Sequence, residues 1–279
     1  MWKSSIDCNQ NLLSAKHCVK TRLFFGNYQN TKHPEIRFYL YTRNNLYEGQ
    51  ELKLFERKTI VQSNFNIRWP IRIFIHGWRA GPRSCACGII KDAYLNTGNY
   101  NIIIMDWSDF ACKQLESASN NVKFAGEKLA EFTTFLKKSF RIPYERIYLI
   151  GHSLGAHVAG HAGLLISPRK YNTIFALDPA APFFSGKNPS DRLDPTDANY
   201  VESITTAIHM AGYSKPNIGH SSIYPNFGDR YQPECARKRF RHNLKEMKDG
   251  KVGRFCKYYM GGDPSRPKDG VFYTYIKNY

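Results

Sequence analysis

The sequence has no run of eighteen or more consecutive apolar residues, which is the length that a membrane-spanning helix needs. Residues 1–20 also lack the contiguous apolar stretch of a secretory signal, so no signal peptide is visible. No internal repeat or low-complexity linker interrupts the 279 residues. We therefore expect no membrane-spanning helix and one domain across residues 1–279.

The patterns of metal-binding and nucleic-acid-binding modules are also missing. Cys85 and Cys87 are one residue too close for a zinc-binding pair, and no second pair or histidine cluster completes a tetrahedral site. No RRM, KH, zinc-finger or basic-zipper pattern accompanies the formal net charge of +17. We expect no metal, no cofactor and no nucleic-acid partner.

Cysteine and positive charge, in contrast, are plentiful. Seven cysteines favour disulfides in an oxidising, extracellular compartment, and the odd number leaves at least one thiol free or intermolecular. The basic residues include a tight cluster, formed by Arg237, Lys238, Arg239 and Arg241. Such a cluster is either a solvated face that aids solubility or a surface that attracts anionic lipid.

Short apolar runs alternate with helical periodicity along the chain, which is typical of a parallel sheet with crossover helices. We predict strands at residues 71–75, 102–105, 147–150 and 174–177. A helix is predicted over residues 119–140, ended by Pro143. After about Asp191 we expect loops and edge strands. The fold class is thus α/β, with a mostly parallel central sheet flanked by helices.

The segment Gly151-His152-Ser153-Leu154-Gly155 directly follows one predicted strand and opens a helix of small residues. Strand, tight turn and helix form the context of the nucleophile elbow in the α/β-hydrolase fold. An isolated GxSxG is weak support, and an ordinary strand-to-helix turn is the alternative. Asp178 ends the next predicted strand, where a carboxylate can orient a base, although an aspartate before proline also suits a simple turn.

The chain order serine, acid, histidine leaves three candidates for the base, namely His209, His220 and His242. His220 precedes an aromatic, proline-containing turn and suits a packed structural role, whereas His209 has no evident partner. His242 remains as the predicted base. We expect the oxyanion donors to be the backbone N–H groups of Leu154 and Trp78, although Trp78 could instead serve only in packing.

These residues together resemble the pancreatic-lipase-like family, which includes insect lipases, venom phospholipases A1 and catalytically silent yolk proteins. The resemblance spans nearly the whole chain and is carried by these segments: Phe38-Tyr39-Leu40-Tyr41-Thr42-Arg43, Ile75-His76-Gly77-Trp78, Asp106-Trp107, Gly151-His152-Ser153-Leu154-Gly155-Ala156-His157, Leu177-Asp178-Pro179-Ala180 and Arg192-Leu193-Asp194-Pro195. Because Ser153 is present, the resemblance favours the lipases and phospholipases over the yolk proteins.

The resemblance implies a secreted serine esterase that attacks lipid at a membrane or droplet interface, either a triacylglycerol lipase or a phospholipase A1. It also implies that the lipid-binding sandwich domain of larger members is absent, and with it a colipase-like partner. The chain departs from the family pattern in its late segments. Members usually carry the catalytic histidine two residues after a cysteine, but Cys256 has no such histidine, and the register of the flanking segments points to His242 instead. Thr205 stands where the family often has histidine, and Ser222 where it commonly has aspartate. A catalytically impaired homologue that binds or carries lipid is the alternative function.

Overall fold

A computed structural model of the chain describes residues 34–215, 218–229 and 270–274. In this part of the chain, nine strands form one sheet in the order β2-β1-β4-β3-β5-β6-β7-β8-β9. The strands are β1 (Arg37–Tyr41), β2 (Gln50–Glu51), β3 (Ile71–Ile75), β4 (Asn101–Asp106), β5 (Ile147–His152), β6 (Tyr171–Leu177), β7 (Ala198–Ile204), β8 (Ser221–Pro225) and β9 (Gly270–Thr274). From β4 to β9 every neighbouring pair is parallel, and only β1 runs antiparallel to its neighbours.

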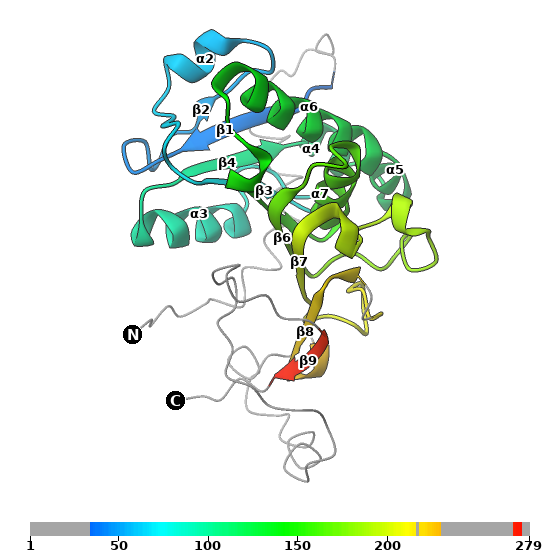
Figure 1. The fold of residues 1–279 in the computed structure, drawn as a ribbon. Coiled ribbons are helices and arrows are strands. Elements are labelled where there is room, and N and C mark those ends of the chain that lie inside the picture. The colour runs from blue at the N-terminus through cyan, green and yellow to red at the C-terminus, as the bar shows by residue number, and fades with distance from the viewer. Residues whose placement is uncertain (1–33, 216–217, 230–269, 275–279) are drawn as a thin grey trace, which may run out of the picture.

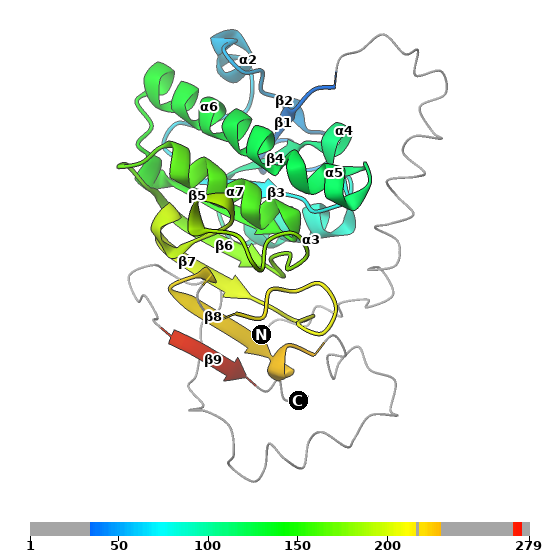
Figure 2. The same cartoon turned by 90° about the vertical axis from the view of Figure 1, so that its right-hand side faces the viewer.

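Helices cover both faces of the sheet (Figure 1). The face turned toward the viewer in Figure 2 carries α4 (Ser108–Ala111), α5 (Leu115–Asn120), α6 (Val122–Phe140) and α7 (Leu154–Leu165). The opposite face is covered by α3 (Cys85–Thr97), while the short α2 (Arg57–Val61) lies beyond β1 and β2. The predicted α/β class is therefore confirmed.

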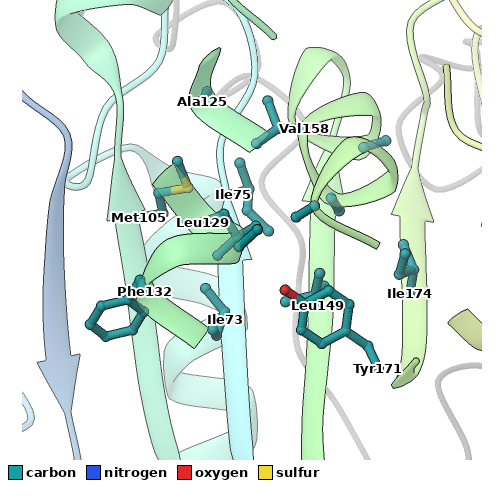
Figure 3. Packing of buried hydrophobic residues seen from close by; sticks show 14 of the residues in the cluster. Ile73, Ile75, Met105, Ala125, Leu129, Phe132, Leu149, Val158, Tyr171 and Ile174 are labelled. Carbon is teal, nitrogen blue, oxygen red and sulfur yellow. The ribbon is translucent and has the colours of Figure 1, made fainter. Parts of the chain in front are cut away.

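The main core lies between the sheet and the pair of helices α6 and α7. Figure 3 shows Leu129 and Phe132 of α6 close to Ile73 of β3, and Val158 of α7 close to Ala125 of α6 and Ile75 of β3. Phe132 also stacks on Phe38 of β1, with ring centroids 3.9 Å apart. Burial of these large apolar side chains provides the main driving force for holding the helices on the sheet.

The four predicted strands are present, and three of them extend beyond the predicted bounds as β4, β5 and β6. The single helix predicted over residues 119–140 is wrong at its start, because α5 ends at Asn120 and α6 begins at Val122. Its end is Phe140, where Arg141 takes a left-handed conformation (φ 55°) before Pro143 is reached. The expectation of edge strands after Asp191 is wrong for β7 and β8, which both lie inside the sheet. Among the described residues, no helix is long and apolar enough to cross a membrane.

Candidate active site

Ser153 occupies a sharp turn between β5 and α7. Its backbone has φ 55° and ψ −118°, a conformation that costs on the order of 1–3 kcal/mol for a residue with a side chain. Its N–H donates to the Leu177 carbonyl at 2.9 Å, which fixes the turn against β6. A Cβ on Gly155 would lie 2.2 Å from the Ile75 carbonyl oxygen, and one on Gly151 would lie 2.5 Å from the Ala156 Cα. Both glycines of the motif are therefore required by the close approach of β3, β5 and α7.

Asp178 directly follows β6, the strand next to β5. Because His152 and Leu177 are paired in the parallel register, Ser153 and Asp178 leave the same edge of the sheet at equivalent positions. The Ala180 N–H also points to the Ser153 carbonyl, at 3.4 Å. The structure thus brings together the predicted nucleophile and the predicted acid at the carboxyl ends of the strands.

The carboxylate of Asp178 is held by Thr206, a residue that the sequence analysis missed. The Thr206 N–H donates to Oδ1 at 2.5 Å, and its hydroxyl donates to Oδ2 at 2.6 Å. The Asp178 N–H donates to the Ile204 carbonyl at 2.7 Å, so the backbone after β6 is also joined to the end of β7. A threonine after β7 becomes recognisable only once β7 is known to lie next to β6, and no local motif marks it.

The loop after β3 lies against the nucleophile. A Cβ on Gly77 would lie 2.8 Å from the Ser153 Cβ, so a glycine is needed for this approach. Trp78 is half-buried, packs against the core and donates its indole N–H to the Lys113 carbonyl at 2.8 Å. Among the described residues, the backbone N–H groups of Trp78 and Leu154 have no hydrogen-bond acceptor. The Trp78 side chain can therefore pack against the core while its backbone N–H remains available as an oxyanion donor.

The three candidate bases are placed differently. His220 precedes β8 at the amino edge of the sheet, opposite Ser153, and its Nδ1 accepts the Val201 N–H at 3.0 Å. The predicted structural role of His220 is thereby confirmed. His209 is exposed in the turn after β7, on the same edge as Ser153. His242 lies outside the described residues, and its role stays a prediction.

With this geometry established, comparison with known proteins assigns the chain to a family. The family model described as Lipase matches residues 3–255. The chain belongs to the lipase family. The α/β-hydrolase fold inferred from the elbow and its flanking strands is therefore the fold of a lipase-family protein.

Among curated members of the lipase family, hepatic triacylglycerol lipase of Rattus norvegicus is 35% identical over 72% of this chain and 42% of its own length. Pancreatic triacylglycerol lipase of Sus scrofa is 34% identical over 74% of this chain and 46% of its own length. Inactive pancreatic lipase-related protein 1 of Mus musculus is 34% identical over 72% of this chain and 43% of its own length. The chain thus matches less than half the length of these relatives.

Behind the site of this lipase-family chain, His157 of α7 joins the elements that carry Ser153 and Asp178. Its Nε2–H donates to the Ala180 carbonyl at 2.8 Å, and its Nδ1 accepts the Leu193 N–H at 3.1 Å. The ring stacks on Phe184 with centroids 3.8 Å apart. Burial disfavours the charged ring and lowers the pKa of His157 to about 3, so the imidazole is neutral at pH 7.

The buried His157 predicts a loss of stability in acid. Because its folded pKa lies below the unfolded value of 6.5, its contribution is present above pH 6.5 and is lost as the pH falls toward about 3. Between pH 7 and 4.5 the free energy of unfolding should fall by about 2–3 kcal/mol through this residue. Urea unfolding at both pH values should show a smaller loss in His157→Gln. His209→Gln, at an exposed position, is the control. Equal losses of unfolding free energy in the wild-type chain, His157→Gln and His209→Gln would show that His157 is not the source of the acid sensitivity.

Two cysteines at the start of α3 take no part in the site. Cys85 and Cys87 are free thiols, and Cys87 is buried, with its thiol donating to the Gly81 carbonyl at 3.3 Å. Burial raises the pKa of Cys87 to about 12, so the thiol stays protonated. Across the described ranges, no group of three or more His, Cys, Asp or Glu side chains is arranged to hold a metal ion.

Proposed function

We propose that the chain is a serine carboxylester hydrolase that acts on lipid esters through Ser153, Asp178 and His242. The observation that carries this proposal is the strained elbow at Ser153, set beside a carboxylate whose two oxygens are both held by Thr206. Backbone strain of this kind persists only where the surrounding structure imposes it, and it is concentrated at functional sites. Membership of the lipase family supports the choice of a lipid ester as substrate.

In the proposed reaction, His242 removes the Ser153 hydroxyl proton while Oγ attacks the ester carbonyl carbon. The carbonyl oxygen becomes an oxyanion, which accepts hydrogen bonds from the N–H groups of Trp78 and Leu154. His242 then gives its proton to the departing alcohol, and the acyl group remains on Ser153. Water, activated by the same histidine, attacks this ester, and the fatty acid leaves with the serine proton restored. Asp178 orients the histidine and stabilises its charged form throughout.

Triacylglycerol and phospholipid are the two substrate classes that we consider. The curated relatives named above as triacylglycerol lipases support the first class. The resemblance of the sequence to a family that includes insect lipases and venom phospholipases A1 supports the second class. Both substrates present a fatty acyl ester to the same nucleophile, so the mechanism is unchanged between them.

We also propose that the protein acts outside the cell at a lipid interface. Disulfides form in oxidising compartments, and Cys112 is disulfide-bonded. The basic cluster at residues 237–241, outside the described residues, suits an anionic lipid surface.

A catalytically impaired lipid-binding homologue is the second candidate. The specific observation in its favour is the similarity to a mouse relative whose name includes the word inactive. The strained turn at Ser153, the Thr206 contact that holds Asp178 and the close approach of Gly77 to Ser153 support the hydrolase proposal instead. We therefore favour the hydrolase.

Fatty-acid release by the purified full chain tests this choice. The chain is incubated with emulsified triacylglycerol, with phospholipid vesicles and with a soluble short-chain ester. The hydrolase proposal predicts turnover of the soluble ester and of at least one lipid. Binding to both lipids without any acid release would favour the impaired homologue.

Thr206 provides a separate prediction about positioning. Thr206→Val keeps the shape but removes the hydroxyl that binds Asp178, so kcat should fall roughly 10- to 100-fold, as expected when a charge-assisted hydrogen bond is lost, with KM unchanged. Thr206→Ser retains the hydroxyl and should keep most of the activity. Thr205→Val, at the buried neighbouring position, is the matched control. Equal damage from the valine and serine variants of Thr206 would show that the hydroxyl contact is not what matters.

A further inference from the structure

The turn beside Ser153 contains an arginine where a glycine is favoured. The Ala80 N–H bonds the Gly77 carbonyl at 3.3 Å, so residues 77–80 form a β-turn. Arg79 is the third residue of this turn and has φ 52°, in the left-handed region. Glycine is the usual residue at such a position, and a side chain there costs on the order of 1–2 kcal/mol. Arg79 therefore carries a conformational cost that glycine would not, and what its side chain contacts becomes the question.

The Arg79 side chain is exposed and held above the oxyanion loop. Its guanidinium carbon lies 4.4 Å from the centre of the Trp78 ring, and that ring is itself fixed to the Lys113 carbonyl. The Arg79 N–H donates to the Ala111 carbonyl at 3.1 Å, which joins the two loops. The guanidinium is therefore presented by a rigid turn rather than by a free loop.

A second cation lies on the adjoining loop. Lys113 is exposed, and its Nζ lies 5.4 Å from the centre of the Phe110 ring. Within residues 34–215 and the other described segments, neither Arg79 nor Lys113 has a carboxylate partner. Arg79 therefore lies against Trp78, whose N–H we assign to the oxyanion, and Lys113 lies on the loop whose backbone carbonyl holds the Trp78 ring.

We propose that Arg79, assisted by Lys113, binds the phosphate of a glycerophospholipid whose acyl ester lies at Ser153. This inference rests on the proposed function and selects its substrate class. In such a lipid the phosphate and the scissile ester are attached to one glycerol unit, so an anion lies close to the oxyanion loop during attack. The planar guanidinium matches phosphate through paired N–H···O bonds, and triacylglycerol offers no such group.

A purely structural role for Arg79 makes a different prediction. If its guanidinium only steadies the Trp78 ring, its loss weakens the oxyanion loop and slows every ester to the same extent. If it binds phosphate, its loss slows phospholipid selectively. The ratio of kcat/KM between a phospholipid and a neutral lipid with the same acyl chains separates the two roles.

The test uses the full chain with phosphatidylcholine and with the matching diacylglycerol, each in micelles of one neutral detergent. Phosphatidylcholine is zwitterionic, so attraction of the whole basic protein to an anionic surface does not contribute. Arg79→Gln should lower the phospholipid-to-diacylglycerol ratio roughly 10- to 100-fold, the usual effect of truncating a hydrogen bond to a charged group. Arg79→Gly, which suits the turn, should lower the ratio equally without a loss of melting temperature. Arg83→Gln, at an exposed position four residues on, should leave the ratio unchanged.

An unchanged ratio in Arg79→Gln and Arg79→Gly would overturn the inference and leave the hydrolase proposal intact. If the wild-type chain hydrolyses neither lipid, the proposed function fails and binding decides the inference. Monomeric short-chain phosphatidylcholine is then titrated into the Ser153→Ala chain with and without Arg79→Gln. A roughly 10-fold or larger rise in Kd would support the phosphate site, and equal Kd values would reject it.

Discussion

Replacing Ser153 with alanine is expected to lower kcat by about a million-fold, as loss of a triad serine does elsewhere. The alanine keeps the elbow but removes the only oxygen that can accept the acyl group in the proposed reaction. The residual rate would come from the oxyanion donors and substrate binding alone. Hydrolysis of a soluble ester at saturation measures this loss without interference from lipid adsorption.

Ser185→Ala is a matched control for this substitution. Ser185 lies on the loop that follows Asp178, and its hydroxyl donates to the Ala181 carbonyl at 3.0 Å. Removing that hydroxyl should leave kcat within a few-fold of the wild-type value. A Ser153→Ala chain that retains a tenth or more of the wild-type rate would show that hydrolysis takes place without this nucleophile.

Replacing His242 with alanine is expected to be nearly as damaging as Ser153→Ala. Serine and histidine act as one unit, so losing either removes the activated nucleophile. The double variant Ser153→Ala/His242→Ala should therefore be no slower than either single variant. This non-additivity distinguishes loss of a shared catalytic function from two independent effects on folding.

Alanine variants of His220 and His209, the other two candidate bases, provide the comparison for His242→Ala. His220→Ala should retain hydrolysis in chains that fold, because His220 lies at the opposite edge of the sheet and bonds the Val201 N–H. His209→Ala should also retain activity if His242 is the base. Because His209 is exposed on the same edge as Ser153, it is the main competitor. An inactive His209→Ala chain beside an active His242→Ala chain would move the base to His209.

Much of the fold could be predicted because buried parallel strands appear as short apolar runs. The run at residues 71–75 matched β3 at both ends, since both faces of this strand are covered. The break at Asn121 was missed because α5 and α6 both continue an apolar pattern across it. β7 and β8 were expected at the edges because their segment is rich in Pro, Gly and charge. Their burial arises from strand order, which local composition does not encode.

The candidate site was predictable wherever its residues follow a strand directly. Ser153 and Asp178 could be predicted in this way, because the carboxyl ends of parallel strands meet at one edge. Thr206 was not found, since its contact with Asp178 depends on β7 lying next to β6. Arg79 was also missed, because the left-handed conformation that makes it unusual is visible only in the structure.

The most direct test of the proposed nucleophile is covalent labelling with a fluorophosphonate probe, followed by mass spectrometry of the digested protein. An activated serine attacks the phosphorus and displaces fluoride, so one probe should be added per chain, on the peptide that contains Ser153. The Ser153→Ala chain should remain unlabelled under the same conditions. Undiminished labelling of the Ser153→Ala chain, or a probe found on another residue of the wild-type chain, would contradict the assignment of Ser153 as the nucleophile.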